Sequence, residues 1–310
     1  MLTIIAAIVP IFLLIVMGFV LRRVLIKEES HWAGTEQLVY YVLFPALLFR
    51  TLSHAKLSEV PLFGVGGALL IAVLLMATLC LALRPILMKR LGVSGPSFTS
   101  IFQCSCRWQT YVALAVAGNL YGEIGLTLAS VAMVAMIPIL NIMAVWVLAH
   151  YAAPTRLSWP RILLTIAQNP FIWACALGLA ANLTGLTFPK WIDEFTDALG
   201  RSSLALGLLV VGAGLQLKGV LRPDAPALLS CVLKLVVMPA MAISLGLAFG
   251  LSGANLAIVA CCSSVPTASS AYLLARQMGG DAPLVAEILT LQTALAIITM
   301  PIAIALVVRF

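Results

Sequence analysis

The sequence predicts an all-α integral membrane protein with ten transmembrane helices in two inverted five-helix repeats. Of its 310 residues, 63% are hydrophobic and only 9% are charged, and the mean hydropathy is +1.12. A soluble domain of this size needs more charge on its surface. Apolar runs of about 20 residues, the length that crosses roughly 30 Å of hydrocarbon, follow one another with short connections. The lipid bilayer is therefore the expected environment.

The ten expected spans follow in order from these apolar runs. In the first half they cover residues 2–22, 32–53, 61–84, 97–120 and 124–150. In the second half they cover 161–183, 190–217, 225–251, 254–276 and 283–308. Pro45, Pro138 and Pro239 lie inside three of these spans and should kink them, because proline removes a helical hydrogen bond. Arg22 and Arg23 follow the first run and no basic segment precedes it, so this run is expected to be a helix rather than a cleaved signal peptide.

Basic residues are distributed unevenly over the connections. Only five fall in the loops of one face, namely Arg50, Lys56, Lys190, Arg201 and Arg309. Cytoplasmic loops carry the excess of lysine and arginine, so the opposite, richer face is expected to be cytoplasmic. Ten spans return the chain to its starting side. Both termini are therefore predicted to lie outside the cytoplasm. The protein itself is predicted to reside in an inner or plasma membrane. The net charge of +7 is explained by this pattern and does not indicate a nucleic-acid partner.

The two halves, residues 1–153 and 154–310, share features at a nearly constant spacing. Pairs that are 160 positions apart are Pro10 with Pro170 and Gly18 with Gly178. An odd number of spans in each half places the second half upside down in the membrane. Such inverted repeats are typical of secondary transporters, whose binding site lies near the middle of the membrane where interrupted helices meet.

Two interruptions are expected, in the fourth and ninth spans. The ninth contains CCSSVPTASS, in which Pro266 lacks a backbone donor and forces Val265 toward an extended conformation. The repeat places Arg107 opposite Val265, so the fourth span should break there as well. Backbone groups freed at that depth need protein or a water-filled cavity to satisfy them.

Arg107 stands in QCSCRWQTY, far from any other charge in the sequence. An arginine inside the membrane is costly, which favours a functional site. Its guanidinium offers a planar fork of donors that suits a carboxylate. The predicted substrate-binding residues are Gln103, Arg107, Gln109, Thr110, Ser263, Ser264, Pro266, Thr267 and Ser269. The alternative is that Arg107 only binds the carbonyls of a broken helix.

Three further residues are candidates for support or coupling. Lys234 would neutralise unwound carbonyls, or would extend toward the cytoplasmic surface. Asn141 would bond freed backbone groups or the substrate. Glu287 would carry a coupling proton if burial raised its pKa, or would be an ordinary interfacial glutamate.

Several classes of site are not indicated by the sequence. The seven cysteines lie in apolar runs without a CxxC pair or a His/Cys ligand set, so no disulfide framework, metal or cofactor is predicted. Paired aspartates, HExxH or a convergent Ser/His set are missing from the spans, so an enzyme is not expected. Without a Walker A motif, energy is expected from a gradient of protons or from the membrane potential.

Four segments in a characteristic order resemble the auxin efflux carrier family. They are LVYYVLFPALLFRTLS (38–53), CRWQTYVALA (106–115), IPILNIMAV (137–145) and VPTASSAYLLARQMGGD (265–281). Bacterial members of this family include malonate transporters. The resemblance implies a fold similar to sodium/proton antiporters and bile acid symporters, in which the fourth and ninth helices unwind and cross and small organic anions bind at the crossing. This chain has Trp108 and Gln109 where the family pattern leads us to expect phenylalanine and asparagine, which implies a reshaped pocket.

The expected function is secondary transport of small mono- or dicarboxylates by alternating access. Protons and a second copy of the chain are counted as candidate partners. The alternatives are a cation/proton antiporter on the same fold, or a sensor or channel that binds the anion. The basic rather than acidic charge at the expected crossing weakens the antiporter hypothesis.

Overall fold

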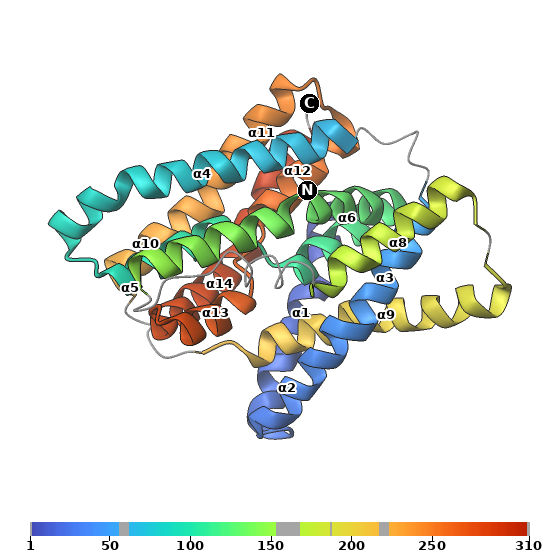
Figure 1. Cartoon of the computed structure of the whole chain (residues 1–310), viewed down its shortest axis with the longest axis horizontal. Coiled ribbons are helices and arrows are strands. Elements are labelled where there is room, and N and C mark those ends of the chain that lie inside the picture. The colour runs from blue at the N-terminus through green and yellow to red at the C-terminus, as the bar shows by residue number, and fades with distance from the viewer. Residues whose placement is uncertain (1, 56–61, 153–167, 187, 217–222, 309–310) are drawn as a thin grey trace.

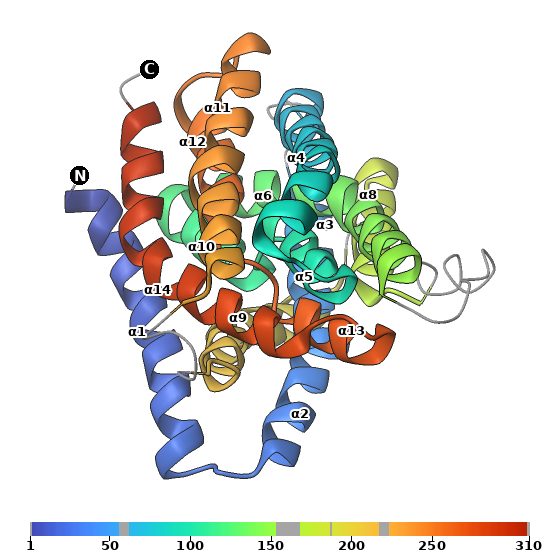
Figure 2. The same cartoon turned by 90° about the vertical axis from the view of Figure 1, so that its left-hand side faces the viewer.

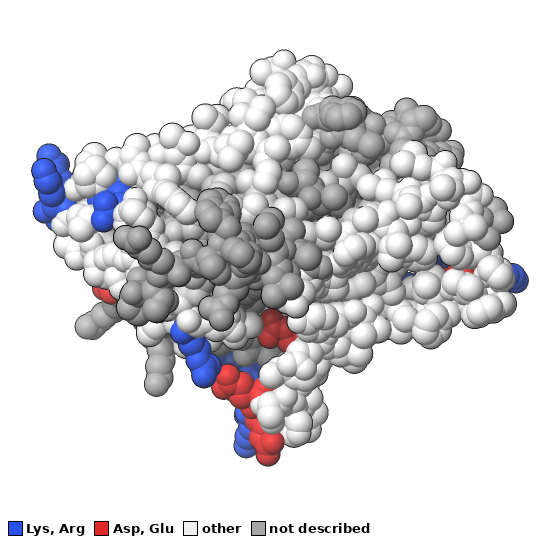
Figure 3. Space-filling model, in the orientation of Figure 1, with Lys and Arg blue, Asp and Glu red and all other residues white. Residues whose placement is uncertain are grey.

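The computed structural model describes residues 2–55, 62–152, 168–186, 188–216 and 223–308, and these contain helices but no strand. Six described helical segments are long and apolar enough to cross a membrane: Thr3–Val24, Gly64–Leu91, Gly95–Tyr151, Lys190–Ala213, Ala225–Ala248 and Ala282–Val307. Two apolar helices are shorter, Pro170–Thr184 and Gly253–Ser264. On the face drawn in Figure 3, most of the described surface is uncharged, and the described charged side chains lie mainly toward its lower and lateral edges, as contact with lipid requires.

The first half of the chain forms seven described helical elements. These are α1 (Leu2–Val24), α2 (Glu29–Leu38), the π-helical η1 (Val39–Leu43), α3 (Phe44–Ser53), α4 (Leu62–Leu91), α5 (Gly95–Cys106) and α6 (Thr110–Tyr151). The expected end of the third span at residue 84 is wrong, because α4 continues to Leu91 and stops before Gly92, whose φ of 61° is left-handed. The expected fourth and fifth spans meet inside α6 at Gly122, where φ is 56° and the helix changes direction.

The second half forms eight described elements. These are α8 (Pro170–Thr184), α9 (Lys190–Ala213), α10 (Ala225–Val232), the π-helical η3 (Leu233–Val237), α11 (Met238–Ala248), α12 (Gly253–Ser264), α13 (Ser270–Met278) and α14 (Ala282–Val307). Within the span expected over 161–183, the described helix begins at Pro170. Residues 161–167 lie outside the described part, and the side chain of Asn169 accepts the Phe171 N–H at 2.9 Å, which starts α8 at Pro170. The span expected to reach 217 ends at Ala213 before Gly214, and residue 217 is outside the described part.

Two of the three expected proline distortions, those at Pro45 and Pro239, take the form of a π-helical turn. Pro138 instead lies inside α6, whose break in helical geometry is at Gly122. η1 comes directly before α3, which contains Pro45, and η3 comes directly before α11, which contains Pro239. The N–H of Phe44 bonds to the Val39 carbonyl, and that of Met238 to the Leu233 carbonyl, five positions back. A proline cannot bond four positions back and its ring crowds that carbonyl, so the wider turn accommodates it. Each π-turn has a polar residue at its second position, Tyr40 and Lys234.

Glycines bring the helices of one group into close contact. α1 packs on α9, and α3 packs on both α8 and α9 (Figures 1 and 2). A Cβ atom added at Gly18 would lie 2.0 Å from the Leu209 carbonyl oxygen, and one at Gly178 would lie 2.8 Å from the Phe49 oxygen. Only a residue without a side chain allows these backbones so near each other. The two contacts join residues of the first half to residues of the second.

The second group of helices contains both interruptions. α12 packs against α4, α6, α11 and α14, and α5 packs against α4, α6, α10 and α14. Ser97 and Ser100 of α5 donate to the side chain and the carbonyl of Asp281, both at 2.9 Å, which fixes α5 beside the start of α14. The marked ends of the chain lie near one another in both views (Figures 1 and 2).

Candidate functional site

The two interruptions meet main chain to main chain. α5 ends at Cys106 and Arg107 is extended, with φ −72° and ψ 157°. α12 ends at Ser264 and Val265 is extended as well, with φ −67° and ψ 152°. The backbone N–H of Gln109 donates to the Pro266 carbonyl at 2.8 Å. A donor freed by one break therefore satisfies an acceptor freed by the other, as buried backbone requires.

A second bond between the interruptions is made by side chains. Gln109 donates from Nε2 to the hydroxyl oxygen of Ser269 at 2.9 Å. Gln109 is 3% exposed, whereas Ser269 is half-buried. Both the backbone and the side chain of Gln109 thus hold the first interruption against the second.

Gln292 of α14 is a third link. Its Oε1 accepts the N–H of Thr267 at 2.9 Å, and its Nε2 lies 3.2 Å from the carbonyl oxygens of both Cys104 and Ser230. The side chain is 0% exposed. One carboxamide therefore satisfies backbone groups of α5, α10 and the second interruption, which makes it a central polar residue of this core.

A cavity of about 110 Å³ opens beside the interruptions. Its wall combines residues of η1, of both interruptions, of α6 and of the start of α8. They are Tyr40, Arg107, Trp108, Thr110, Ile137, Leu140, Asn141, Asn169, Phe171, Ala268 and Ser270. A volume of this order suits a small ligand.

Arg107 is the one charged residue among the described residues that line this cavity. Its Nη2 donates to Asn141 Oδ1 and to Ser270 Oγ, each at 3.1 Å. Its Nη1 is buried and has no hydrogen-bond partner in the described part of the chain. Asn141 and Ser270 thus hold the guanidinium through Nη2. On its other side, the N–H groups of Nη1 are available to a ligand.

Lys234 lies buried between the ends of the two interrupted helices. It is 1% exposed, so it does not reach the surface, and the snorkelling alternative is wrong. Its neighbours include Cys104 and Cys106 in the last turn of α5 and Cys262 near the end of α12. Helix C-termini carry partial negative charge, which a nearby cation complements.

The other predicted residues divide between the cavity and the surrounding protein. Thr110 and Asn141 line the cavity. The hydroxyls of Ser263 and Ser264 instead donate to carbonyls of their own helix, at 2.7 Å to Val259 and 3.1 Å to Cys261. Gln103 is 0% exposed and lies outside the cavity wall.

Glu287, on α14, lies apart from these residues, and its side chain reaches the start of α10. Its carboxylate accepts the backbone N–H of Asp224 at 3.2 Å. This is the bond of a residue that caps a neighbouring helix, and both predicted roles of Glu287 stay predictions.

Several residues at or near the interruptions are not among the binding residues that the sequence predicts. Gln292 could have been found by the signal that marked Arg107, because it is a large polar side chain in an apolar run. Ser270 and Tyr40 lie within the resemblance segments but do not stand out by type. Asn169 was assigned to the interior of a helix, and the structure places it at a helix start.

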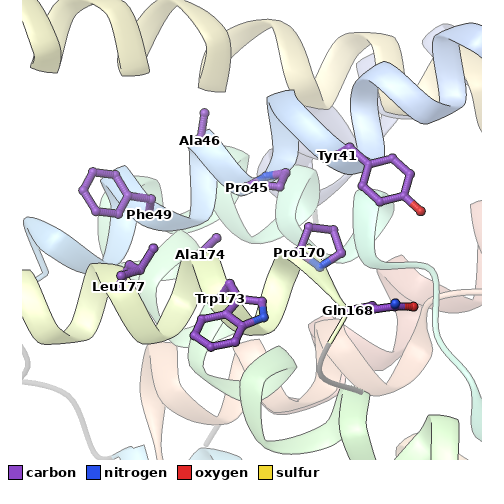
Figure 4. Close-up of a pocket in the computed structure, with 9 residues that line it drawn as sticks. All are labelled: Tyr41, Pro45, Ala46, Phe49, Gln168, Pro170, Trp173, Ala174 and Leu177. Carbon is purple, nitrogen blue, oxygen red and sulfur yellow. The ribbon is translucent and has the colours of Figure 1, made fainter. Parts of the chain in front are cut away.

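A larger hollow of about 750 Å³ lies between α3 and α8 (Figure 4). Tyr41, Pro45, Ala46 and Phe49 line it from η1 and α3, and Pro170, Trp173, Ala174 and Leu177 line it from α8, with Gln168 at one end. Its lining is mostly apolar and includes no charged residue among those described. Binding and discrimination of a polar solute need convergent polar groups, so we assign the candidate site to the smaller cavity at Arg107.

Apolar helices of membrane-spanning length, together with a charged cavity at two broken helices, define a multi-pass membrane transporter. Residues 3–304 match the family described as membrane transport protein, and the chain belongs to this family, that of the auxin efflux carriers. The family is one of transporters and not of enzymes.

Two relatives extend over most of the chain. A Methanothermobacter thermautotrophicus protein named "Uncharacterized transporter" is 24% identical over 302 residues, covering 95% of each chain. A Rhizobium meliloti protein named "Putative malonate transporter" is 24% identical over 299 residues, covering 88% of this chain and 86% of its own.

Proposed function

We propose that this protein is a secondary transporter of small organic anions that binds a carboxylate in the cavity at Arg107. The observation that carries the proposal is the guanidinium itself. It is fixed on one side by Asn141 and Ser270, while its Nη1 has no partner among the described residues and no other charged residue is among those described in the cavity wall. An intramembrane arginine that is preorganised in this way is suited to bind a carboxylate through charge-assisted hydrogen bonds.

The substrates we propose are short mono- or dicarboxylates. The volume of about 110 Å³ supports a small ligand, and the single cation supports one firmly held carboxylate. The relative named as a malonate transporter supports malonate as the first compound to test. A cation/proton antiporter receives less support, because no aspartate or glutamate is among the described residues of the cavity wall.

Alternating access is the mechanism that we propose, on a pair of inverted repeats covering residues 1–153 and 154–310. The reciprocal contacts of Gly18 with Leu209 and of Gly178 with Phe49 support the repeats, since both partners of one contact differ by 160 positions from those of the other. That exchange is what an approximate two-fold axis between the halves produces. The cavity lies between the group formed by α1, α3, α8 and α9 and the group that contains the interruptions, so relative movement of the two groups would change access to it.

The proposal is tested by uptake of labelled malonate, acetate, lactate and succinate into proteoliposomes, with and without an imposed pH gradient. Arg107→Ala is compared with intact protein, and Arg107→Lys keeps the charge without the planar fork. We expect saturable uptake that Arg107→Ala abolishes and Arg107→Lys weakens. A folded protein that takes up none of the panel, or an Arg107→Ala variant with normal uptake, would refute the anion site. Stimulation by the gradient would identify protons as the coupling ion.

A further inference from the structure

Buried polar atoms without a partner are concentrated at the interruptions. The described residues contain eight such side-chain atoms, and five of them belong to Gln103, Arg107, Trp108 and Thr267. Each unpaired buried group costs about 1–3 kcal/mol, so folded proteins keep few of them. Two of these residues, Arg107 and Trp108, line the cavity, where a ligand can supply the missing partner.

Trp108 is the member of this cluster that the expected site did not include. It lines the cavity next to Arg107, it is 3% exposed, and its indole Nε1 has no acceptor within the described part of the chain. Trp32 provides a contrast, because its Nε1 donates to the Ile26 carbonyl at 2.7 Å. An indole N–H can only donate, and a buried one normally finds an acceptor. The missing partner of Trp108 must therefore be an acceptor.

We propose that the indole N–H of Trp108 is a second donor to the transported anion and acts with Nη1 of Arg107 on one carboxylate group. This inference rests on the proposed function and adds a specificity-determining residue to it. Asn141 and Ser270 occupy Nη2, so Arg107 lacks the free fork that would bind both carboxylate oxygens at once. The indole supplies the missing donor from the next residue along the chain.

The rest of the wall restricts the body of the ligand. Apolar residues, Ile137, Leu140 and Phe171, alternate there with uncharged polar ones, and no second cation is among the described lining residues. A second ionised carboxylate would lose its hydration there without gaining a countercharge. The site therefore suits an anion with one ionised carboxylate on a short body, such as lactate or singly protonated malonate.

The test compares Trp108→Phe with intact protein in proteoliposomes. The exchange keeps an aromatic ring in the wall and removes only the donor. Trp146→Phe is the matched control, because Trp146 is 46% exposed and lies on α6 outside the cavity wall. A hydrogen bond to a charged group contributes about 1.5–3 kcal/mol, which corresponds to a rise in KM of about 10- to 150-fold. We expect that rise for lactate and malonate in Trp108→Phe, with Vmax within about twofold, and no change in the control.

The outcomes separate this inference from the function on which it rests. If intact protein transports carboxylates, Arg107→Ala abolishes uptake and Trp108→Phe leaves KM unchanged, only the role of Trp108 is overturned. If folded intact protein transports no carboxylate, the proposed function fails and this inference falls with it. Should Trp108→Phe not fold, β-(3-benzothienyl)alanine at position 108 keeps the bicyclic shape and replaces the N–H by sulfur. An unchanged KM in that protein would equally overturn the proposal.

Discussion

Gln109 donates its backbone N–H to the carbonyl oxygen of Pro266 at 2.8 Å, so the broken backbones of two distant segments complete each other. Each interruption is thus a partner for the other as well as a wall of the cavity. A substitution in one interruption will therefore change the stability of the other. The side-chain bond between Gln109 and Ser269 makes this coupling measurable.

We predict that Gln109 and Ser269 are energetically coupled. Gln109→Ala and Ser269→Ala should each lower the free energy of unfolding by about 0.5–1.5 kcal/mol, and the double variant should lose less than the sum. Thermal unfolding of the four purified proteins in one detergent gives the coupling energy. Strict additivity would show that the 2.9 Å bond contributes nothing to stability.

Gln292→Leu should be among the most destabilising single changes in the core. It leaves the Thr267 N–H and the carbonyls of Cys104 and Ser230 without their partner, at a cost of about 1–3 kcal/mol for each group left unpaired. We expect a fall of several degrees in melting temperature. The control is Gln277→Leu, the same exchange at an exposed position of α13, which should change the melting temperature little. Equal effects of the two variants would contradict a central role for Gln292.

Lys234→Met should reduce uptake while leaving the melting temperature unchanged or higher. A buried ammonium without a carboxylate partner loses its hydration, and an apolar side chain of similar length avoids that cost. The charge would then be retained because it complements the ends of α5 and α12 during transport. Melting curves and initial uptake rates of the same preparation test both parts. A clear fall in melting temperature would identify Lys234 as a structural residue instead.

Gly18→Ala should destabilise the contact between α1 and α9. The added Cβ would lie 2.0 Å from the Leu209 carbonyl oxygen, so the helices must separate, at a cost of about 1–3 kcal/mol or more. Gly34→Ala in α2 is the matched control, because nothing lies within 4 Å of its added Cβ. That exchange should stabilise the protein by up to about 1 kcal/mol, since alanine is the better helix former. Thermal unfolding of both variants decides the matter, and a stable Gly18→Ala protein would argue against close packing at this crossing.

The sequence predicted best those features that follow from local backbone chemistry. The break at Pro266 has a direct cause, since proline has no N–H to donate and the residue before it avoids the helical region. The break at Arg107 required the repeat as well, because no proline marks it. The predicted helix ends were less accurate where a glycine terminates the helix, as Gly92 does. In those places the end of the apolar run is not the end of the helix.

The orientation of polar side chains could not be derived from the sequence. Ser263 and Gln109 both fall at the interruptions, but a serine near a helix end can bond to its own backbone, and the structure shows that Ser263 does so. The bonds that Gln292 makes depend on how α14 packs against α5 and α10, which composition does not encode. The neighbours of Arg107 were therefore predicted only in part.

The glycine contacts also have a consequence for biosynthesis. α1 is made early, but Leu209, the residue that Gly18 contacts, lies far along the chain. At a synthesis rate of about 5–20 residues per second, roughly 10–40 s pass before the ribosome has made the partner of α1. Throughout that interval the glycine face of α1 lies in the bilayer without its native neighbour. The newly inserted helix must therefore be shielded by lipid or by the insertion machinery until its partner arrives.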